Sequence, residues 1–258
     1  MNPQETLNAY IAITRKEIVR FMRIWTQTLL PPVITQSLYF IIFGNFIGSR
    51  VGDVRGVDYI EFIVPGLVMM SIITSSFANV ASSFFGSKFQ KNIEELLVSP
   101  TPNWVIVAGY TTGGIVRGLL VGFIVFMVSF SFVKNLQVQN PFLVIVFAFL
   151  TAVVFSLAGL INGILAKKFD DIGIFPTFIL TPLTYLGGVF YSISNLPFFW
   201  QQISKLNPVL YMIDGFRYSF YGFQDLNIYS SLMLLTSVCL VLILTNISIL
   251  NKGIGLRS

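Results

Sequence analysis

The chain has 258 residues, of which 55% are hydrophobic and 10% are charged. Soluble domains average roughly 45 to 50% apolar and about 25% charged residues, so this composition excludes an ordinary water-soluble globule. Histidine is absent and there is one cysteine, which excludes histidine bases, His or Cys zinc sites, CxxC redox pairs and an intramolecular disulfide. With a mean hydropathy of +0.79, the counts indicate a membrane protein.

Six apolar stretches predict transmembrane helices, because the hydrocarbon core of a bilayer is about 30 Å thick and needs roughly 20 helical residues. In chain order they are residues 29–47, 63–85, 104–133, 142–166, 172–190 and 228–250. The fifth contains two prolines, which membrane helices tolerate when neighbouring groups satisfy the freed carbonyls. We therefore predict an all-α, polytopic membrane protein with one domain over residues 1–258.

The distribution of lysine and arginine predicts the orientation of the spans. With the N-terminus in the cytoplasm, ten basic residues flank the cytoplasmic span ends and five flank the outer ends, while Arg117 lies inside a span. An even number of spans then places both termini in the cytoplasm. The net charge of +5 is explained by this bias, so no nucleic-acid partner is expected.

The N-terminal segment, residues 1–24, carries a basic amphipathic pattern. Apolar residues recur at helical spacing between residues 7 and 24 and alternate with four basic residues. This pattern predicts an interfacial helix in the lipid headgroup plane, and a plain basic flank of the first span is the alternative. The charged region extends to Arg23 without a following small-x-small site, so no cleavable signal peptide is predicted.

The segment between the second and third spans, residues 86–103, predicts a short cytoplasmic helix. Its apolar residues share one face at the spacing i, i+4, i+7 and i+8: Phe89, Ile93, Leu96 and Leu97. Glu94 and Glu95 lie between them, and two prolines end the helix. We expect this helix to bind a soluble partner, and a helix that rests on lipid is the alternative.

The segment between the fifth and sixth spans, residues 191–227, is rich in aromatic side chains. A long irregular loop would be rare, and stretches of this length are too short to span a bilayer. We predict an outer, re-entrant or interfacial hairpin of short helices, in which the rings lie at the membrane surface. An aromatic belt that caps the protein without a role in transport is the alternative.

Arg117 is the one charged residue within a predicted span. An arginine there costs on the order of 3 kcal/mol and usually has a partner, so we expect it to pair with Asp170 or Asp171. Glycines follow one another at every fourth position around it, at Gly114 and Gly118 among others, and this row predicts close packing against another helix.

Energy for transport is not predicted to come from this chain alone. The sequence contains no G-x-x-x-x-G-K-[ST] motif, so ATP cannot bind in a phosphate loop here. No carboxylate lies at a span centre, which argues against a proton-coupled carrier. Neither a catalytic site nor a metal site is predicted, because Asp170 and Asp171 beside two lysines are better explained as a solvated connection.

Several strings are similar to the ABC-2 type membrane permeases. They are VPGLVMMSIITSSFANV (64–80), NIEELLVSP (92–100), KKFDDIGIFPTFILTPLTYLGGVFYSISNLP (167–197) and LNPVLYMIDGFRY (206–218). The chain resembles this family over essentially its whole length, and in particular the YadH-like inner-membrane permeases and the nodulation-factor exporter NodJ. The order of basic helix, six spans, cytoplasmic helix and outer hairpin also agrees.

The resemblance implies a homodimer in the bacterial inner membrane, with a separate cytoplasmic ATP-binding subunit that holds ATP and Mg²⁺. The helix around Phe89 to Val98 would be the coupling helix. It has KNIEEL where many relatives carry E-x-G-T-x-E, so it keeps Glu95 and Leu96 and lacks the Gly-Thr pair.

The resemblance further implies a substrate path beside the first, second and fifth spans. The aromatic hairpin is expected to close the outer mouth, with the gate where the fifth span ends. The path residues are Phe40, Phe43, Asn79, Thr181, Thr184 and Tyr185. The gate residues are Gly187, Gly188, Phe190 and Tyr191.

Three classes of function remain at this point. The first is the permease subunit of an ATP-driven exporter for an amphipathic, lipid-linked or saccharide-type substrate. The second is a secondary carrier or channel that needs no ATP. The third is a membrane-embedded transferase, which the absence of histidine and of clustered acids disfavours.

Overall fold

A computed structural model describes residues 2–133 and 136–255. It is almost entirely helical, with one two-stranded antiparallel hairpin that pairs Asp53 with Asp58 and Val54 with Val57. In chain order the elements are α1 (Pro3–Arg23), α2 (Trp25–Thr28), α3 (Leu30–Tyr39), the π-helix η1 (Phe40–Ile47), α4 (Gly48–Val51), β1 (Asp53–Val54), β2 (Val57–Asp58), α5 (Tyr59–Phe89), α6 (Asn92–Val98), α7 (Asn103–Ser129), α8 (Pro141–Leu165), α9 (Phe169–Phe175), the π-helix η2 (Pro176–Leu180), α10 (Thr181–Tyr185), the 3₁₀ helix η3 (Ile193–Asn195), α11 (Phe198–Lys205), α12 (Pro208–Tyr221) and α13 (Ile228–Lys252).

Five helical segments within the described residues are long and apolar enough to cross a membrane. They are Trp25–Val51, Tyr59–Phe89, Asn103–Ser129, Pro141–Leu165 and Ile228–Lys252. Each overlaps a span predicted from the sequence, which confirms the all-α membrane fold. The third ends at Ser129, four residues earlier than predicted.

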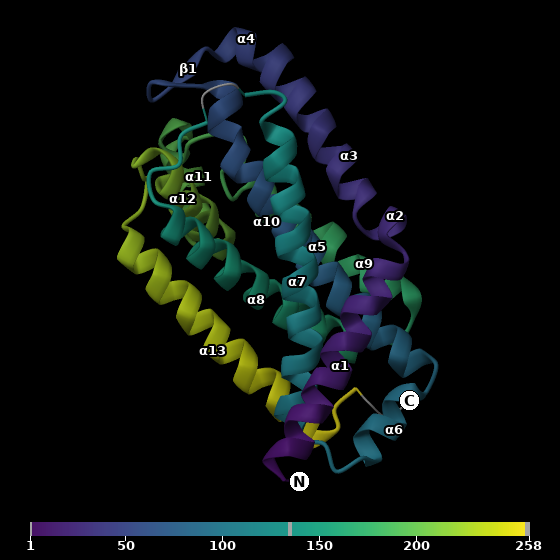
Figure 1. The fold of residues 1–258 in the computed structure, drawn as a ribbon. Helices are drawn as coiled ribbons and strands as arrows, with labels where there is room; N and C mark the ends of the chain where they lie inside the picture. Colours follow the sequence, from purple (N-terminus) through teal and green to yellow (C-terminus); the bar gives the residue numbers. More distant parts are fainter. Residues whose placement is uncertain (1, 134–135, 256–258) are drawn as a thin grey trace.

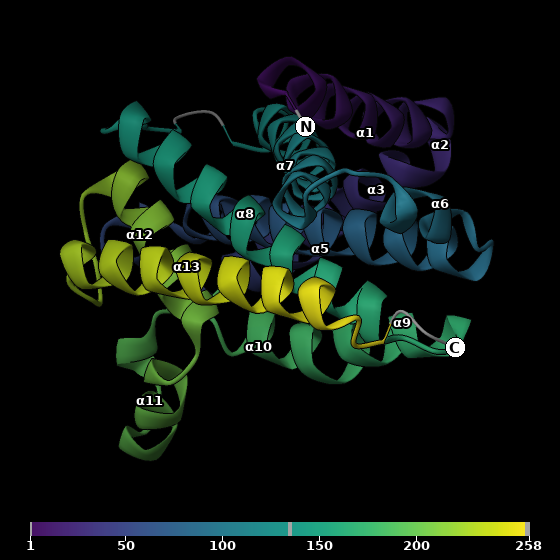
Figure 2. The ribbon, with the colours of Figure 1, turned by 90° about the horizontal axis from the view of Figure 1, so that it is seen from below.

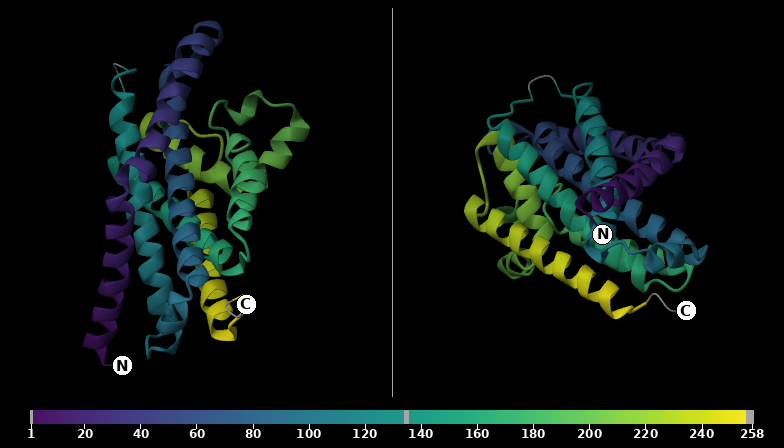
Figure 3. Two further views of the ribbon diagram at one scale, coloured as in Figure 1. Left: turned by 90° about the vertical axis from the view of Figure 1, so that its right-hand side faces the viewer. Right: turned by 60° about the horizontal axis from the view of Figure 1, so that its bottom comes forward.

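The fifth predicted span is helical over α9, η2 and α10 but is shorter than the other five and irregular. Pro182 has no N–H for the carbonyl of Phe178, so the regular hydrogen-bond ladder cannot continue there and a π-helical turn precedes it. Along this segment the chain nevertheless runs back from the side where α8 ends toward the side where α11 and α12 lie (Figure 3, left). As a result, the start of α1 and the end of α13 lie at the same end, together with α6 (Figure 1).

Helix starts follow recognisable local signals. Asn140 and Asn207 each precede a proline, and their side-chain oxygens accept the backbone N–H of Leu143 and Val209. The asparagine caps the first turn, and a proline at the first helical position has no N–H that needs a partner. The same Asn-Pro pair therefore begins both α8 and α12.

The core of the bundle is α5, whose side chains are buried along nearly all of its length. The predicted glycine row of α7 faces it: added Cβ atoms at Gly114, Gly118 and Gly122 would collide with side chains of α5. On α8, a Cβ at Gly159 would collide with the carbonyl oxygen of Phe77. Glycine thus lets two neighbouring helices approach the central helix closely, as the small-xxx-small pattern predicts.

The N-terminal helix α1 extends over Pro3–Arg23, where the sequence predicts an amphipathic helix. Its buried residues Ile13, Glu17 and Phe21 lie one turn apart on one side. That side packs on α7, and a Cβ at Gly109 would lie 2.6 Å from a methyl of Ile13. The apolar side of α1 therefore rests on the bundle itself.

The segment between α10 and α13 forms short helices, as predicted: the 3₁₀ helix η3 and the α-helices α11 and α12. Most of α12 is buried against the bundle, whereas α11 projects away from it (Figure 2). The exposed fractions of Phe198 and Phe199 on α11 are 74% and 67%. Such exposed rings suit contact with a lipid surface better than contact with water.

Close approach of α8 to α5 provides the first test of this fold. Gly159→Ala should lower the free energy of unfolding by about 1–3 kcal/mol, because the new methyl meets backbone, which cannot rotate away. Gly86→Ala on α5 is the matched control, since a Cβ there meets no atom within 4 Å. It should be neutral or stabilise the helix by up to about 1 kcal/mol. Denaturant unfolding in detergent micelles would measure both, and equal effects would contradict the packing described.

Candidate functional site

The helix α6 follows directly on the central helix α5. Lys91, in a left-handed backbone conformation with φ of 63°, makes the turn between them. Ile93 is buried, and Leu96 and Leu97 pack half-buried beside it against the bundle. The apolar face that the sequence predicts as a partner-binding surface is therefore turned inward.

The surface that α6 and the end of α5 present to solvent includes part of the predicted set. Glu94 and Glu95 are exposed, and Val98 is 86% exposed. Phe89, the last residue of α5, is also exposed and meets the ring of Phe169 edge-on, with 4.7 Å between ring centroids. The carboxylates of Glu94 and Glu95 and the exposed apolar side chains of Val98 and Phe89 are thus available to a partner at this end.

A second contact connects the base of α6 to the neighbouring helix pair. The ammonium group of Lys88 donates to the carbonyl oxygens of Ile164 and Ala166, each at 2.7 Å. These carbonyls lie at the C-terminal end of α8, where no further helical N–H can reach them. A cation at this position also suits the helix dipole. Movement of the α5–α6 junction would therefore displace the end of α8 or break these hydrogen bonds.

A buried polar cluster, composed of Glu17, Arg20, Asn79 and Ser83, joins α1 to α5. The Ser83 hydroxyl donates to Glu17 at 2.7 Å, and the Arg20 guanidinium lies 3.4 Å from the same carboxylate. Arg20 also donates to the side-chain oxygen of Asn79 at 2.8 Å and to its carbonyl at 3.0 Å. Glu17 and Asn79 are fully buried, so each depends on these partners for hydrogen bonding.

Sequence reasoning missed this cluster, although a signal was present. Glu17 falls between Ile13 and Phe21 at intervals of four residues, which puts a carboxylate in the middle of the apolar stripe of α1. Such a residue must find a partner inside the protein. Arg20, one turn further on, provides it.

Arg117 does not pair with Asp170 or Asp171, and that prediction is wrong. Its guanidinium is buried and donates to the carbonyl oxygen of Thr28 at 3.1 Å. In a regular helix this carbonyl would accept the N–H of residue 32, which is a proline and has none. Arg117 therefore satisfies the backbone at the bend between α1 and α3.

The carboxylate of Asp171 has a local partner instead. It accepts the backbone N–H groups of Lys167 and Lys168 at 2.8 and 3.0 Å. Asp170 is exposed. Asp171 alone thus closes the loop between α8 and α9.

Three of the predicted path and gate residues meet in an aromatic cluster formed by Tyr39, Phe43, Tyr185 and Phe190. Phe43 and Phe190 stack with 4.2 Å between ring centroids, and Tyr185 stacks on Phe190 at 5.8 Å. Tyr39, which the sequence did not single out, shares a hydrogen bond of 3.0 Å with the Tyr185 hydroxyl. The cluster joins α3 and η1 to the end of α10.

The other predicted path residues lie elsewhere or point inward. Phe40 is buried and stacks on Phe132, and Asn79 belongs to the polar cluster. The Thr184 hydroxyl is buried and donates to the carbonyl of Thr181 at 2.8 Å, while Thr181 itself is exposed. The predicted path residues do not form one continuous surface within this chain.

The predicted gate segment is held from two sides. Gly188 adopts a φ of 78°, which favours glycine, and its carbonyl oxygen accepts a hydrogen bond of 2.6 Å from Arg217. The guanidinium of Arg217 also lies 4.0 Å from the ring centroid of Phe62. The Tyr59 hydroxyl donates to the carbonyl of Phe190 at 2.9 Å. The segment is therefore fixed to α5 and α12.

Two further gate residues differ in how tightly they are packed. A Cβ at Gly187 would lie 2.8 Å from a methyl of Val209 on α12, so no larger residue fits there without movement. Tyr191 is half-buried. An ion pair between Arg55 and Asp225 lies beyond them and connects the β hairpin to the loop before α13.

Comparison with known proteins shows the family to which this chain belongs. Residues 8–221 match the family described as ABC-2 type transporter. The chain belongs to this family. It is a transport permease subunit and not an ATPase, in agreement with the absence of a phosphate loop.

Relatives agree with this assignment at two levels of similarity. The inner membrane transport permease YadH of Escherichia coli strain K12 is 59% identical over 247 residues, which cover 96% of each chain. Nodulation protein J of Rhizobium leguminosarum bv. viciae is 24% identical over 218 residues, 83% of this chain and 82% of that protein. Nodulation protein J of Rhizobium meliloti strain 1021 is 25% identical over 209 residues, 81% of this chain and 79% of that protein.

The polar cluster provides a test of how α1 is held. Arg20→Ala should lower the free energy of unfolding by about 3 kcal/mol, the lower end of the range for removing one partner of a buried pair, because Arg20 keeps some contact with solvent. Arg23→Ala is the matched control, since Arg23 is exposed on the same helix. Loss of α1 protection in hydrogen exchange should accompany the first variant and not the second. Equal stability of the two variants would show that the cluster does not hold α1.

Proposed function

We propose that this chain is the inner-membrane permease subunit of an ATP-driven exporter. The YadH relative carries the inner-membrane assignment through its 59% identity over nearly the whole of both chains. The proposed cargo is an amphipathic, lipid-linked or saccharide-type molecule. ATP and Mg²⁺ would be bound by a separate cytoplasmic ATP-binding subunit, and this chain would bind neither.

The proposed topology has six crossings. Five apolar helices alone would leave the start of α1 and the end of α13 on opposite sides of a membrane. These ends lie together (Figure 1), and this supports a sixth crossing along the return through α9, η2 and α10. With the excess of basic residues on the cytoplasmic side, α6 and both termini would lie in the cytoplasm, α1 at the cytoplasmic surface and the hairpin of α11 and α12 at the outer surface.

The observation that carries the proposal is the position of α6 at the end of the most deeply buried helix. A subunit that binds the exposed side of α6 would push on α5, which packs against α7, α8 and α12. The same helix is joined to α1 by the hydrogen bonds of the polar cluster. The hydrogen bonds of Lys88 would pass the same movement to α8 and α9. Binding energy released outside the membrane could thus rearrange the helices inside it.

The aromatic cluster marks the proposed cargo route. It lies beside α3, η1, η2 and α10. The outer surfaces of these helices expose large apolar residues, among them Leu38, Phe46 and Phe178 at 51%, 70% and 73%. A second copy of the chain facing this surface would enclose a path between the two subunits. Aromatic rings with hydroxyl groups suit a cargo that has both apolar and polar parts.

Charge reversal on α6 tests the contact with the ATP-binding subunit. Replacing Glu94 and Glu95 with lysine should weaken association with that subunit and lower ATP turnover of the complex several-fold, because both carboxylates are exposed and the fold does not use them. Lys252→Glu, an exposed change at the end of α13, is the control and should leave both unchanged. Pull-down and ATPase assays would measure these effects, and full association of the double variant would contradict the proposed contact.

Cysteine crosslinking tests the proposed dimer. In a background with Cys239→Ser, Leu38→Cys on α3 should be joined to a second copy by a short bis-maleimide in native membranes. Leu240→Cys, also exposed but on α13, should remain monomeric. A dimer band for Leu240→Cys, with none for Leu38→Cys, would move the interface to α13 and away from the aromatic cluster.

A further inference from the structure

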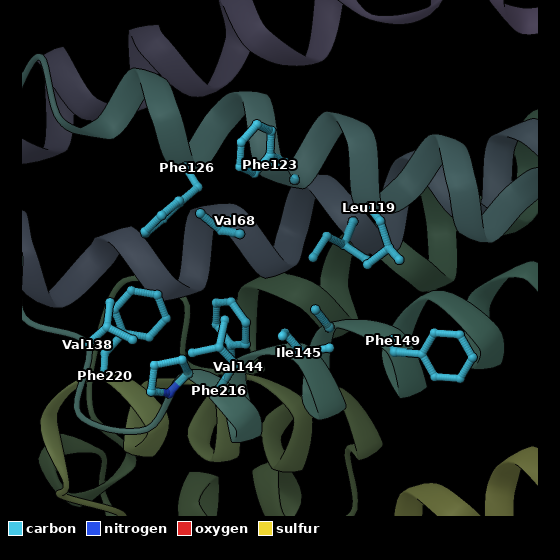
Figure 4. A pocket seen from close by; sticks show the side chains of 14 residues that line it. Val68, Leu119, Phe123, Phe126, Val138, Val144, Ile145, Phe149, Phe216 and Phe220 are labelled. Carbon is cyan, nitrogen blue, oxygen red and sulfur yellow. The ribbon is translucent and has the colours of Figure 1, made fainter.

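An apolar groove lies between α7 and α8 and shares no residue with the aromatic cluster. Its volume is about 440 Å³, within the range of roughly 300 to 1,000 Å³ of small-molecule sites. Side chains of α5 and α12 also line it, so four helices contribute (Figure 4). The groove is therefore a concave site on the side of the bundle and not a gap between two helices alone.

The lining of the groove defines the chemistry of what it can hold. All of its lining residues are apolar, and five of them are phenylalanines. A polar ligand would leave its hydrogen-bonding groups without partners there, which is costly. A hydrocarbon chain would lose nothing and would gain dispersion contacts on every side.

The position of the groove points to the source of that hydrocarbon. It lies along the second half of α7 and the first third of α8, both helices of membrane-spanning length. Phe123, Ile145 and Phe149 at its edges are 59%, 67% and 46% exposed, so the groove opens to the surroundings of these helices. In a bilayer those surroundings are the acyl chains of lipids.

Two features distinguish this site from the ordinary lipid-facing surface. A hydrocarbon chain in the groove would contact α7 and α8 at the sides of the groove and Val68 and Phe216 at its floor. On the exposed side of α13 it would find contact on one side only. Gln139 and Asn140, both exposed, come directly before Pro141 at the outer end of the groove. The side-chain oxygen of Asn140 caps α8. Its Nδ2 group and the amide of Gln139 can form hydrogen bonds with an ester or headgroup at the point where the apolar lining ends.

We propose that the groove binds one acyl chain of a phospholipid from the leaflet at the end opposite the termini, with the headgroup beside Gln139 and Asn140. The bound lipid is a ligand of the bundle and not cargo. Since Val68 belongs to α5 and Phe216 to α12, the bound acyl chain would fill space between the central helix and the outer hairpin. The assignment stands independently of ATP-driven export.

Photo-crosslinking tests the proposal on the intact protein. The permease would be placed in nanodiscs of phosphatidylethanolamine and phosphatidylglycerol that contain a phosphatidylethanolamine with a diazirine in one acyl chain. After illumination, mass spectrometry of peptides would locate the adducts. We expect them to concentrate on residues 119–126 and 138–149, with several-fold fewer on the exposed face of α13.

A pair of matched variants makes the test specific. Ala148→Phe places a ring inside the groove and should lower the adducts on groove residues several-fold. Val241→Phe adds the same ring at a position on α13 that is 61% exposed and outside the groove, and it should leave them unchanged. Thermal unfolding in the same nanodiscs would check that both variants are folded. If Ala148→Phe does not fold, the adduct map of the unchanged protein still tests the proposal.

Two results would overturn the proposal. Adducts spread as densely over α13 as over the groove would mean that the groove holds only bulk lipid. Absence of adducts in the groove, with Phe123→Cys joined to a second copy by a short bis-maleimide, would mean that another protein chain covers it.

Discussion

Close contact of α7 and α8 with the central helix α5 is the constraint on which the rest of the structure depends. Lipid tails are as apolar as leucine, so the hydrophobic effect does not hold helices together inside a bilayer, and close packing must do so. Glycines at positions such as Gly118 and Gly159 allow that packing. The close contacts that they allow also bury polar side chains of α5, including Ser76 and Asn79, away from lipid.

This arrangement makes α5 the element through which other parts can act on one another. At one end it continues into α6, and Lys88 joins the junction to the end of α8. Toward the same end, at Asn79 and Ser83, the polar cluster joins it to α1. At the other end Tyr59 and Phe62 hold the segment around Gly188 and Arg217. A displacement of α5 would therefore reach the N-terminal helix and the gate segment together.

The sequence predicted the parts of this fold that depend on composition and on short-range periodicity. The long apolar runs and the glycine row each have one physical explanation, and the helices and their close contacts were found where these signals stand. The family and the lack of a phosphate loop were also predictable, because both depend on strings of consecutive residues.

Features that depend on which helices become neighbours could not be predicted. The sequence predicts Asp170 or Asp171 as the partner of Arg117, whereas its partner is the carbonyl of Thr28, which Pro32 leaves without an N–H donor. Only the bend between α1 and α3 brings this carbonyl within reach of Arg117. The apolar face of α6 was read as a binding surface because periodicity does not say what covers a face. Here Ile93 packs on the protein's own bundle.

The central claim is that this permease works with a separate ATP-binding subunit. Affinity purification of the tagged chain from its native membrane in mild detergent, followed by mass spectrometry, tests it most directly. The account predicts a cytoplasmic ATP-binding subunit in stoichiometric amount. A dimer of this chain with no nucleotide-binding partner, reproduced after crosslinking, would contradict it and would favour a carrier or channel that works without ATP.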